Sequence, residues 1–104
     1  MRINEQAILM ILTAIGDQNE RPYDDYSYPD HEKEEITFSR WALNEMLGLI
    51  WDHPQNLASE IVEDFAFRCL MYKKISELPD QKRIFTIAAD TALEILEEIK
   101  EVEK

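Results

Sequence analysis

The C-terminal quarter of the chain carries the pattern that most restricts its fold. Apolar side chains recur there at alternating steps of three and four residues, at Phe85, Ala88, Ala92, Ile95, Ile99 and Val102. This is the spacing by which one side of an α-helix packs along a neighbouring helix. The small side chains of Ala88, Ala89 and Ala92 would let that neighbour approach closely. The segment therefore predicts a helix of a bundle, with Asp80 as its N-terminal cap.

Two more helices are predicted in the first half of the chain. The first begins at its cap, Asn4, and stops at Gly16. Its apolar positions cover almost the whole circumference, so we expect it to be buried on most sides. The second begins with Ser39 as its cap and ends near Asp52. Its expected core face comprises Ala42, Leu43, Met46, Leu47, Leu49 and Ile50.

A third helix is predicted from Pro54, in its first turn, to about Glu77. Its expected buried side comprises Leu57, Ile61, Phe65, Cys69 and Tyr72. The chain has 104 residues and only two glycines, and 45% of its residues are apolar. Such a chain can build one core without metal or disulfide bonds. We expect a single all-α domain over residues 1–104, a compact four-helix bundle.

A long acidic loop is predicted between the first two helices, around the stretch YDDYSYPDHEKEE from Tyr23 to Glu35. Residues 17–35 carry eight acids against two bases. Tyr26 and Tyr28 alternate as Ile36 and Phe38 do, which is compatible with a short β-hairpin in which residues 29–32 form the turn. The loop is either a binding surface or a connection that covers part of the helices.

Charge and cysteine content limit the partners and the compartment. The net charge of −11 repels phosphate backbones and anionic lipid, so we expect no direct nucleic-acid or membrane binding. A protein partner with a basic surface would meet the acidic loop first. The single cysteine, Cys69, fits a reducing compartment. Glu5 offsets Arg2 in the short leader before the first apolar run, which argues against a signal peptide and favours the cytoplasm.

Two sets of apolar side chains exceed what a four-helix core can bury. Trp41 falls opposite the core face of the second helix, and something should cover its indole. Either the tyrosines of the loop fold over it or another molecule does. On the third helix, Phe67, Leu70 and Met71 recur at three and four residues on the side away from the core. This is the spacing of an anchor stripe, and we expect it to be buried in a homodimer or by a different protein.

The sequence indicates no catalytic residue, cofactor or metal site. His31, Glu32 and Glu35 have the spacing of metal ligands on a helix, but the second histidine of a zinc-protease helix is missing. The glycines form no phosphate-binding loop, and no serine is framed by glycines.

Glu60, Glu63 and Asp64 on the third helix resemble half of the acidic magnesium site of all-helical nucleotide pyrophosphohydrolases. That family pairs two such helical motifs. The second helix offers only Glu45 where several glutamates are needed. The resemblance implies a magnesium-dependent release of pyrophosphate from nucleoside triphosphates.

We therefore expect a protein–protein interaction or regulatory module without chemistry of its own, acting as a homodimer. The alternatives are an acidic mimic of nucleic acid that inhibits a DNA- or RNA-acting protein, and the pyrophosphohydrolase. The candidate partner-binding residues are Trp41, Phe67, Leu70, Met71, Tyr23, Asp24, Asp25, Tyr26 and Tyr28.

Overall fold

The computed structural model describes the backbone of residues 3–20 and 30–103, and the side chains of residues 4–17 and 34–103. These ranges form four α-helices and contain no strand. The helices are α1 (Ile3–Glu20), α2 (Asp30–Asp52), α3 (Ala58–Ile75) and α4 (Pro79–Glu103). The prediction of an all-α chain with four helices is confirmed.

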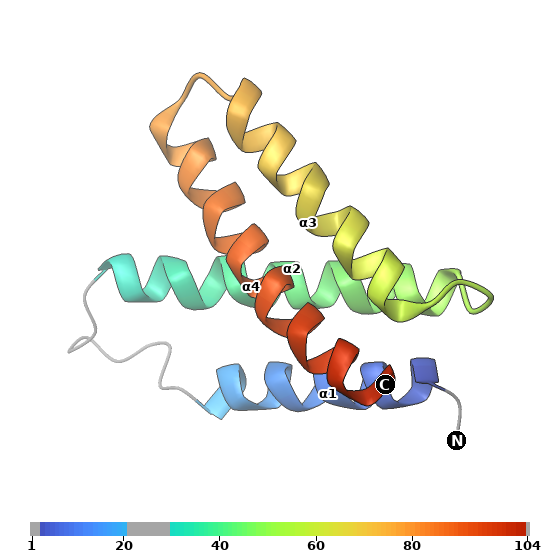
Figure 1. The fold of residues 1–104 in the computed structure, drawn as a ribbon. Helices are drawn as coiled ribbons and strands as arrows, with labels where there is room; N and C mark the ends of the chain where they lie inside the picture. The colour runs from blue at the N-terminus through green and yellow to red at the C-terminus, as the bar shows by residue number, and fades with distance from the viewer. Residues whose placement is uncertain (1–2, 21–29, 104) are drawn as a thin grey trace.

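The helices form two antiparallel pairs that cross each other (Figure 1). α1 and α2 run side by side in opposite directions, and α3 and α4 form a helical hairpin that passes obliquely across them. The turn that joins α3 to α4 lies well away from α1 and α2. The result is a bundle-like globule of 42 × 33 × 22 Å whose α3–α4 hairpin is covered along only part of its length.

The core lies where the two pairs cross. α3 and α4 have the most extensive contact of any two helices. Small side chains on α4 explain this contact. Ala88, Ala89 and Ala92 are each no more than 1% exposed, and their size allows the two helices to approach closely. Ile95 and Ile99 continue the buried side of α4, as the spacing predicts. On α2 the enclosed apolar side chains are Ile36, Ala42, Leu43, Met46 and Ile50.

The first helix is less buried than its composition predicts. Ala7 and Ile11 are enclosed, but Leu9 and Leu12 are exposed to water. α1 lies at the edge of the molecule, against α2 and α4, so only one of its sides meets the core. The predicted stop at Gly16 is also wrong. The helix continues to Glu20, with no positive φ at either glycine.

The second helix begins nine residues before the predicted cap, at Asp30. Ile36 is seven residues before Leu43 and is buried on the same side of the helix, which continues the core face backward. Ile36 and Phe38 therefore belong to α2, and the β-hairpin is wrong for this half. Its other half, with Tyr26 and Tyr28, lies outside the described residues.

Ser39 lies inside α2 and not at its start. It is buried, and its hydroxyl oxygen lies 3.1 Å from that of Thr91 on α4. Thr91 Oγ1 also donates to the carbonyl oxygen of Ile87 at 2.8 Å. The serine therefore links α2 to α4 where a cap was expected.

The third helix begins four residues later than predicted, since Pro54 lies in the turn after α2. Two of its expected core residues are exposed. Leu57 occupies the extended cap position before the helix. Tyr72 lies toward the hairpin end, where it stacks on Phe85 with ring centroids 5.3 Å apart.

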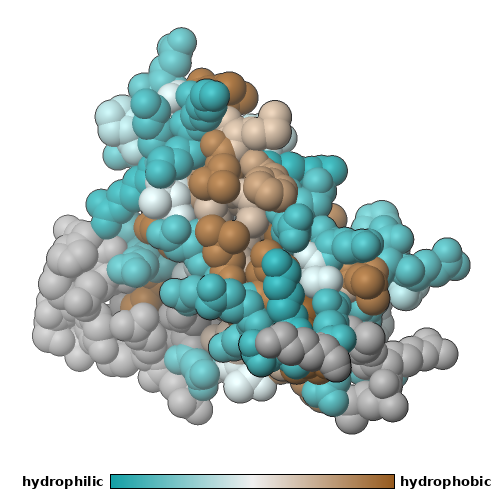
Figure 2. All heavy atoms as spheres, viewed as in Figure 1, coloured by the Kyte–Doolittle hydropathy of each residue, from teal (hydrophilic) through white to brown (hydrophobic). Residues whose placement is uncertain are grey.

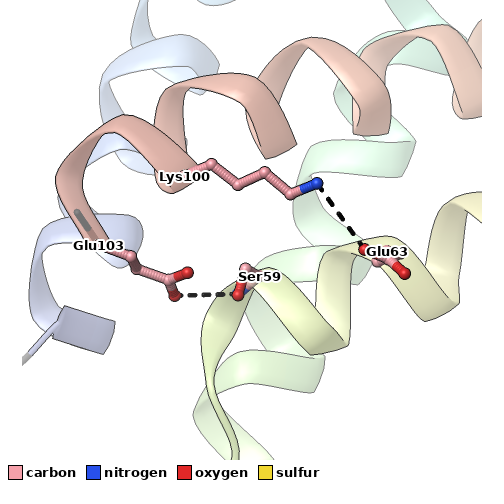
Figure 3. A network of polar contacts seen from close by, with 4 residues as sticks. All are labelled: Ser59, Glu63, Lys100 and Glu103. Carbon is pink, nitrogen blue, oxygen red and sulfur yellow. Dashed lines mark hydrogen bonds and ion pairs between the residues drawn. The ribbon is translucent and has the colours of Figure 1, made fainter.

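The end of α4 holds the beginning of α3. Glu103 Oε1 accepts a hydrogen bond of 3.4 Å from the backbone N–H of Ser59. One turn earlier on α4, Lys100 Nζ lies 3.9 Å from Glu63 Oε2 (Figure 3). A carboxylate near the first amides of a helix is electrostatically favourable. The two contacts fix the lower part of the α3–α4 hairpin.

Candidate interaction surface

The outer stripe of α3, which we define as Phe67, Leu70 and Met71, is exposed. Phe67 is 58%, Leu70 40% and Met71 66% accessible to water. The opposite side of the same helix is enclosed and includes Val62, Ala66 and Cys69. The sequence spacing therefore predicts the position of the stripe correctly, and its use as a binding surface stays a prediction.

Apolar surface also continues beyond the stripe. Figure 2 shows apolar atoms gathered along the line where α3 and α4 run side by side, from the hairpin end downward. Ile75 and Leu78 contribute exposed apolar surface at the hairpin end. Leu93 is also exposed, but it lies among the acidic residues Asp90, Glu94 and Glu97 of α4. Large exposed apolar patches are uncommon on monomers, so this surface is a candidate interaction surface.

A shallow hollow of about 690 Å³ lies at the hairpin end. Its apolar lining is formed by Tyr72, Ile75, Leu78, Ile84 and Phe85. The stacked rings of Tyr72 and Phe85 form one wall of it. The hollow is open to water, which distinguishes it from an enclosed small-molecule site.

Trp41 is partly covered from within the described chain. Its ring lies 6.2 Å, centroid to centroid, from that of Phe65 on α3, in a tilted arrangement. It remains 41% exposed. The other proposed cover lies outside the described residues, as do all the candidate loop residues Tyr23, Asp24, Asp25, Tyr26 and Tyr28.

Sequence reasoning missed Trp51, which is 71% exposed near the end of α2. Ile75 and Leu78 were missed as well. A helical projection at about 100° per residue would have found Trp51, since it falls outside the core face that contains Met46 and Ile50. No such signal exists for Leu78, because it lies in the turn between helices.

The acidic residues of α3 do not gather as a metal site would require. Asp64 Oδ2 pairs with Arg68 Nε at 2.9 Å, and Glu63 pairs with Lys100. Glu60 and Asp64 both line a hollow of about 340 Å³ beside Arg68. Among the described side chains, no group of three or more histidine, cysteine, aspartate or glutamate residues could hold a metal ion.

The metal ligand candidates of α2 are only partly described. The side chains of His31 and Glu32 lie outside the described set, and Glu35 is exposed.

A row of carboxylates covers the outer face of α4. Its members are exposed and fall on one side of the helix, namely Asp90, Glu94, Glu97, Glu98 and Glu101. The outer face of α4 is thus strongly negative, whereas the outer stripe of α3 is apolar.

The thiol of Cys69 lies in the core, on the buried side of α3. Burial raises the pKa of the Cys69 thiol to about 11, because the thiolate would lose its hydration in the core. The thiol is therefore protonated at neutral pH and is not poised as a nucleophile.

Comparison of the chain with known protein families, curated proteins and solved structures finds no significant match. None of the described helices is both long and apolar enough to cross a membrane.

Proposed function

We propose that this chain is a protein–protein interaction module that forms a homodimer through the outer stripe of α3. The observation that carries the proposal is the exposure of Phe67 and Met71, one helical turn apart, on a helix whose other side is the core. Phenylalanine and methionine are enriched in protein interfaces relative to the remaining surface. Fully burying either side chain is worth about 1.5 to 3 kcal/mol.

The position of the stripe supports the same proposal. It lies on the helical hairpin that α1 and α2 cover only in part, so a second molecule can approach it without rearranging the fold. The stripe also lacks charged side chains at its centre, which is the composition of an interface core. Regulation by association, with no chemistry of its own, is the role that this surface supports. The buried, protonated thiol of Cys69 fits a reducing compartment, so we place this role in the cytoplasm.

Sedimentation equilibrium of the wild type and the Phe67→Ser variant tests the proposal. The variant should weaken the dimer at least tenfold, that is by about 1.4 kcal/mol or more, because each two-fold interface loses two phenylalanine rings. Trp51→Ser is the matched control, since it removes a still more exposed aromatic side chain from α2. Equal dissociation constants for wild type and Phe67→Ser would exclude the stripe as the interface.

A second candidate function is the mimicry of nucleic acid by the acidic row of α4. Five carboxylates over residues 90–101 correspond to one about every 4 Å along a helix that rises 1.5 Å per residue. One strand of DNA carries a phosphate about every 3.4 Å of axis. The row thus offers a charge spacing that a protein with a DNA-binding groove would accept.

Inhibition of a panel of DNA- and RNA-acting enzymes, at low and at high salt, tests the mimic. Inhibition should fall steeply as salt rises and should be lost in Glu94→Gln with Glu97→Gln. The absence of inhibition at low salt across the panel would remove this candidate. Phe67→Ser should leave any such inhibition unchanged, which separates the two functions.

A further inference from the structure

Charges and apolar side chains follow a fixed order along the outer face of α3. Asp64, Phe67, Met71 and Lys74 succeed one another at steps of three, four and three residues, which places them on one side of the helix. Leu70 lies beside the two central residues. All of these side chains are exposed. Along this face, in chain order, an acidic side chain is therefore followed by apolar side chains and then by a basic one.

We propose, resting on the homodimer proposed above, that two copies pair their α3 helices antiparallel about a two-fold axis between Phe67 and Met71. Phe67 then packs against the partner's Met71. Asp64 lies three residues before Phe67, and Lys74 lies three residues after Met71. The same register therefore sets Asp64 opposite the partner's Lys74, and the symmetry repeats this ion pair at the other end of the apolar centre.

The charges select this arrangement over its parallel alternative. Parallel pairing would set Asp64 against its own copy and Lys74 against its own copy, and both contacts repel. Antiparallel pairing turns both contacts into attractions. Within one chain Asp64 and Lys74 are about 15 Å apart along the helix axis, which is too far for an ion pair. Each can therefore meet the other only across the dimer.

The arrangement is compatible with the ion pair that Asp64 already makes. Arg68 Nε contacts one oxygen of the Asp64 carboxylate, and both side chains are largely in water. A carboxylate has two oxygens and can accept from both a guanidinium and an ammonium group. Asp64 would then be shared between Arg68 and the partner's Lys74.

Reciprocal charge reversal tests the register. Asp64→Lys and Lys74→Asp should each weaken the dimer about tenfold at low salt, because each creates two like-charge contacts. The double variant restores both attractions and should return the dissociation constant to within about threefold of the wild type. Glu45→Lys, which reverses an exposed acid on α2, is the matched control and should change it less than about twofold.

Disulfide cross-linking tests the antiparallel register independently. Under oxidation, the double variant Asp64→Cys with Lys74→Cys should form a covalent dimer, and Lys74→Cys alone should not. In a parallel dimer the single variant would cross-link to its own copy. Native Cys69 is enclosed, so it does not compete for cross-linking in the folded protein.

The outcomes separate this inference from the proposed function. A wild-type dimer that is unaffected by the single reversals, or that is weakened further by the double reversal, overturns the antiparallel register and leaves the homodimer intact. Asp64 would then serve only its pair with Arg68, and Lys74 the dipole at the end of α3. A wild-type protein that stays monomeric overturns both.

Discussion

The side-chain oxygen of Asn4 on α1 accepts a hydrogen bond of 2.9 Å from the backbone N–H of Ala58, the first residue of α3. Asn4 Nδ2 donates in turn to the carbonyl oxygen of Asn56 at 2.8 Å. The first amides of a helix have no partner within the helix. Leu57, at the cap position of α3, has no side-chain oxygen to offer. The cap of α3 is therefore supplied by a residue 54 positions earlier in the chain.

Replacement of Asn4 should destabilise the whole fold and not α1 alone. Asn4→Ala should lower the free energy of unfolding by about 1 to 2 kcal/mol, because α3 loses its cap and the turn loses a donor. Urea unfolding at one fixed protein concentration measures this. Asn44→Ala is the control. Asn44 donates only to the carbonyl oxygen of Arg40 within its own helix, and its loss should cost less than about 0.5 kcal/mol. Equal costs for the two variants would contradict the role of Asn4.

Replacement of Gly48 should have the opposite effect. Gly48 lies in the middle of α2 with a negative φ, and a Cβ there would meet no described atom within 4 Å apart from its neighbours in the chain and the backbone of its own helix. Gly48→Ala should therefore stabilise the protein by about 0.5 to 1 kcal/mol, since alanine loses less backbone entropy on helix formation. The midpoint of urea unfolding should rise without a change in the slope. A lower midpoint would mean that Gly48 is needed for close approach of another molecule.

The burial of Cys69 predicts a dependence of stability on pH in the alkaline range. Burial raises the pKa of this thiol from 9.0 to about 11, so the unfolded chain releases the proton first as pH rises. The contribution of the protonated thiol to the free energy of unfolding is therefore fully present below pH 9 and is lost as pH rises from 9 through 11. The gap in unfolding free energy between wild type and Cys69→Ala should shrink by about 1 kcal/mol between pH 8 and pH 10. A gap that stays constant over this range would show that the thiol ionises equally in both states.

The core could be predicted from the sequence where periodicity alone decides it. The steps of three and four on α4 identify Ala88, Ala92, Ile95 and Ile99, all of which are enclosed. The outermost members of the pattern differ, since Phe85 is half-buried and Val102 is exposed. The exposed position of Phe67 follows from the same projection of α3. Periodicity works in these segments because each helix is long and meets the core along one side.

Helix ends and the relation between helices could not be predicted in this way. Local signals at Gly16, Ser39 and Pro54 each suggested a boundary, and at each place the structure differs. The sequence predicts Asn4 as the cap of α1, but the amide that its side chain reaches is that of Ala58 on α3. Which amide the Asn4 side chain reaches depends on how α1 packs against the turn before α3. That packing is tertiary structure, which local sequence signals do not determine. The same holds for Trp41, whose neighbour Phe65 comes from another helix.

The homodimer proposed above buries the outer stripe of α3 between two copies of the chain. Its most direct test is the molar mass of the wild type in solution, by light scattering after size exclusion at low and high salt. We expect twice the chain mass of 12.3 kDa at both salts, because the centre of the interface is apolar. A mass of 12.3 kDa at every concentration and both salts would contradict it.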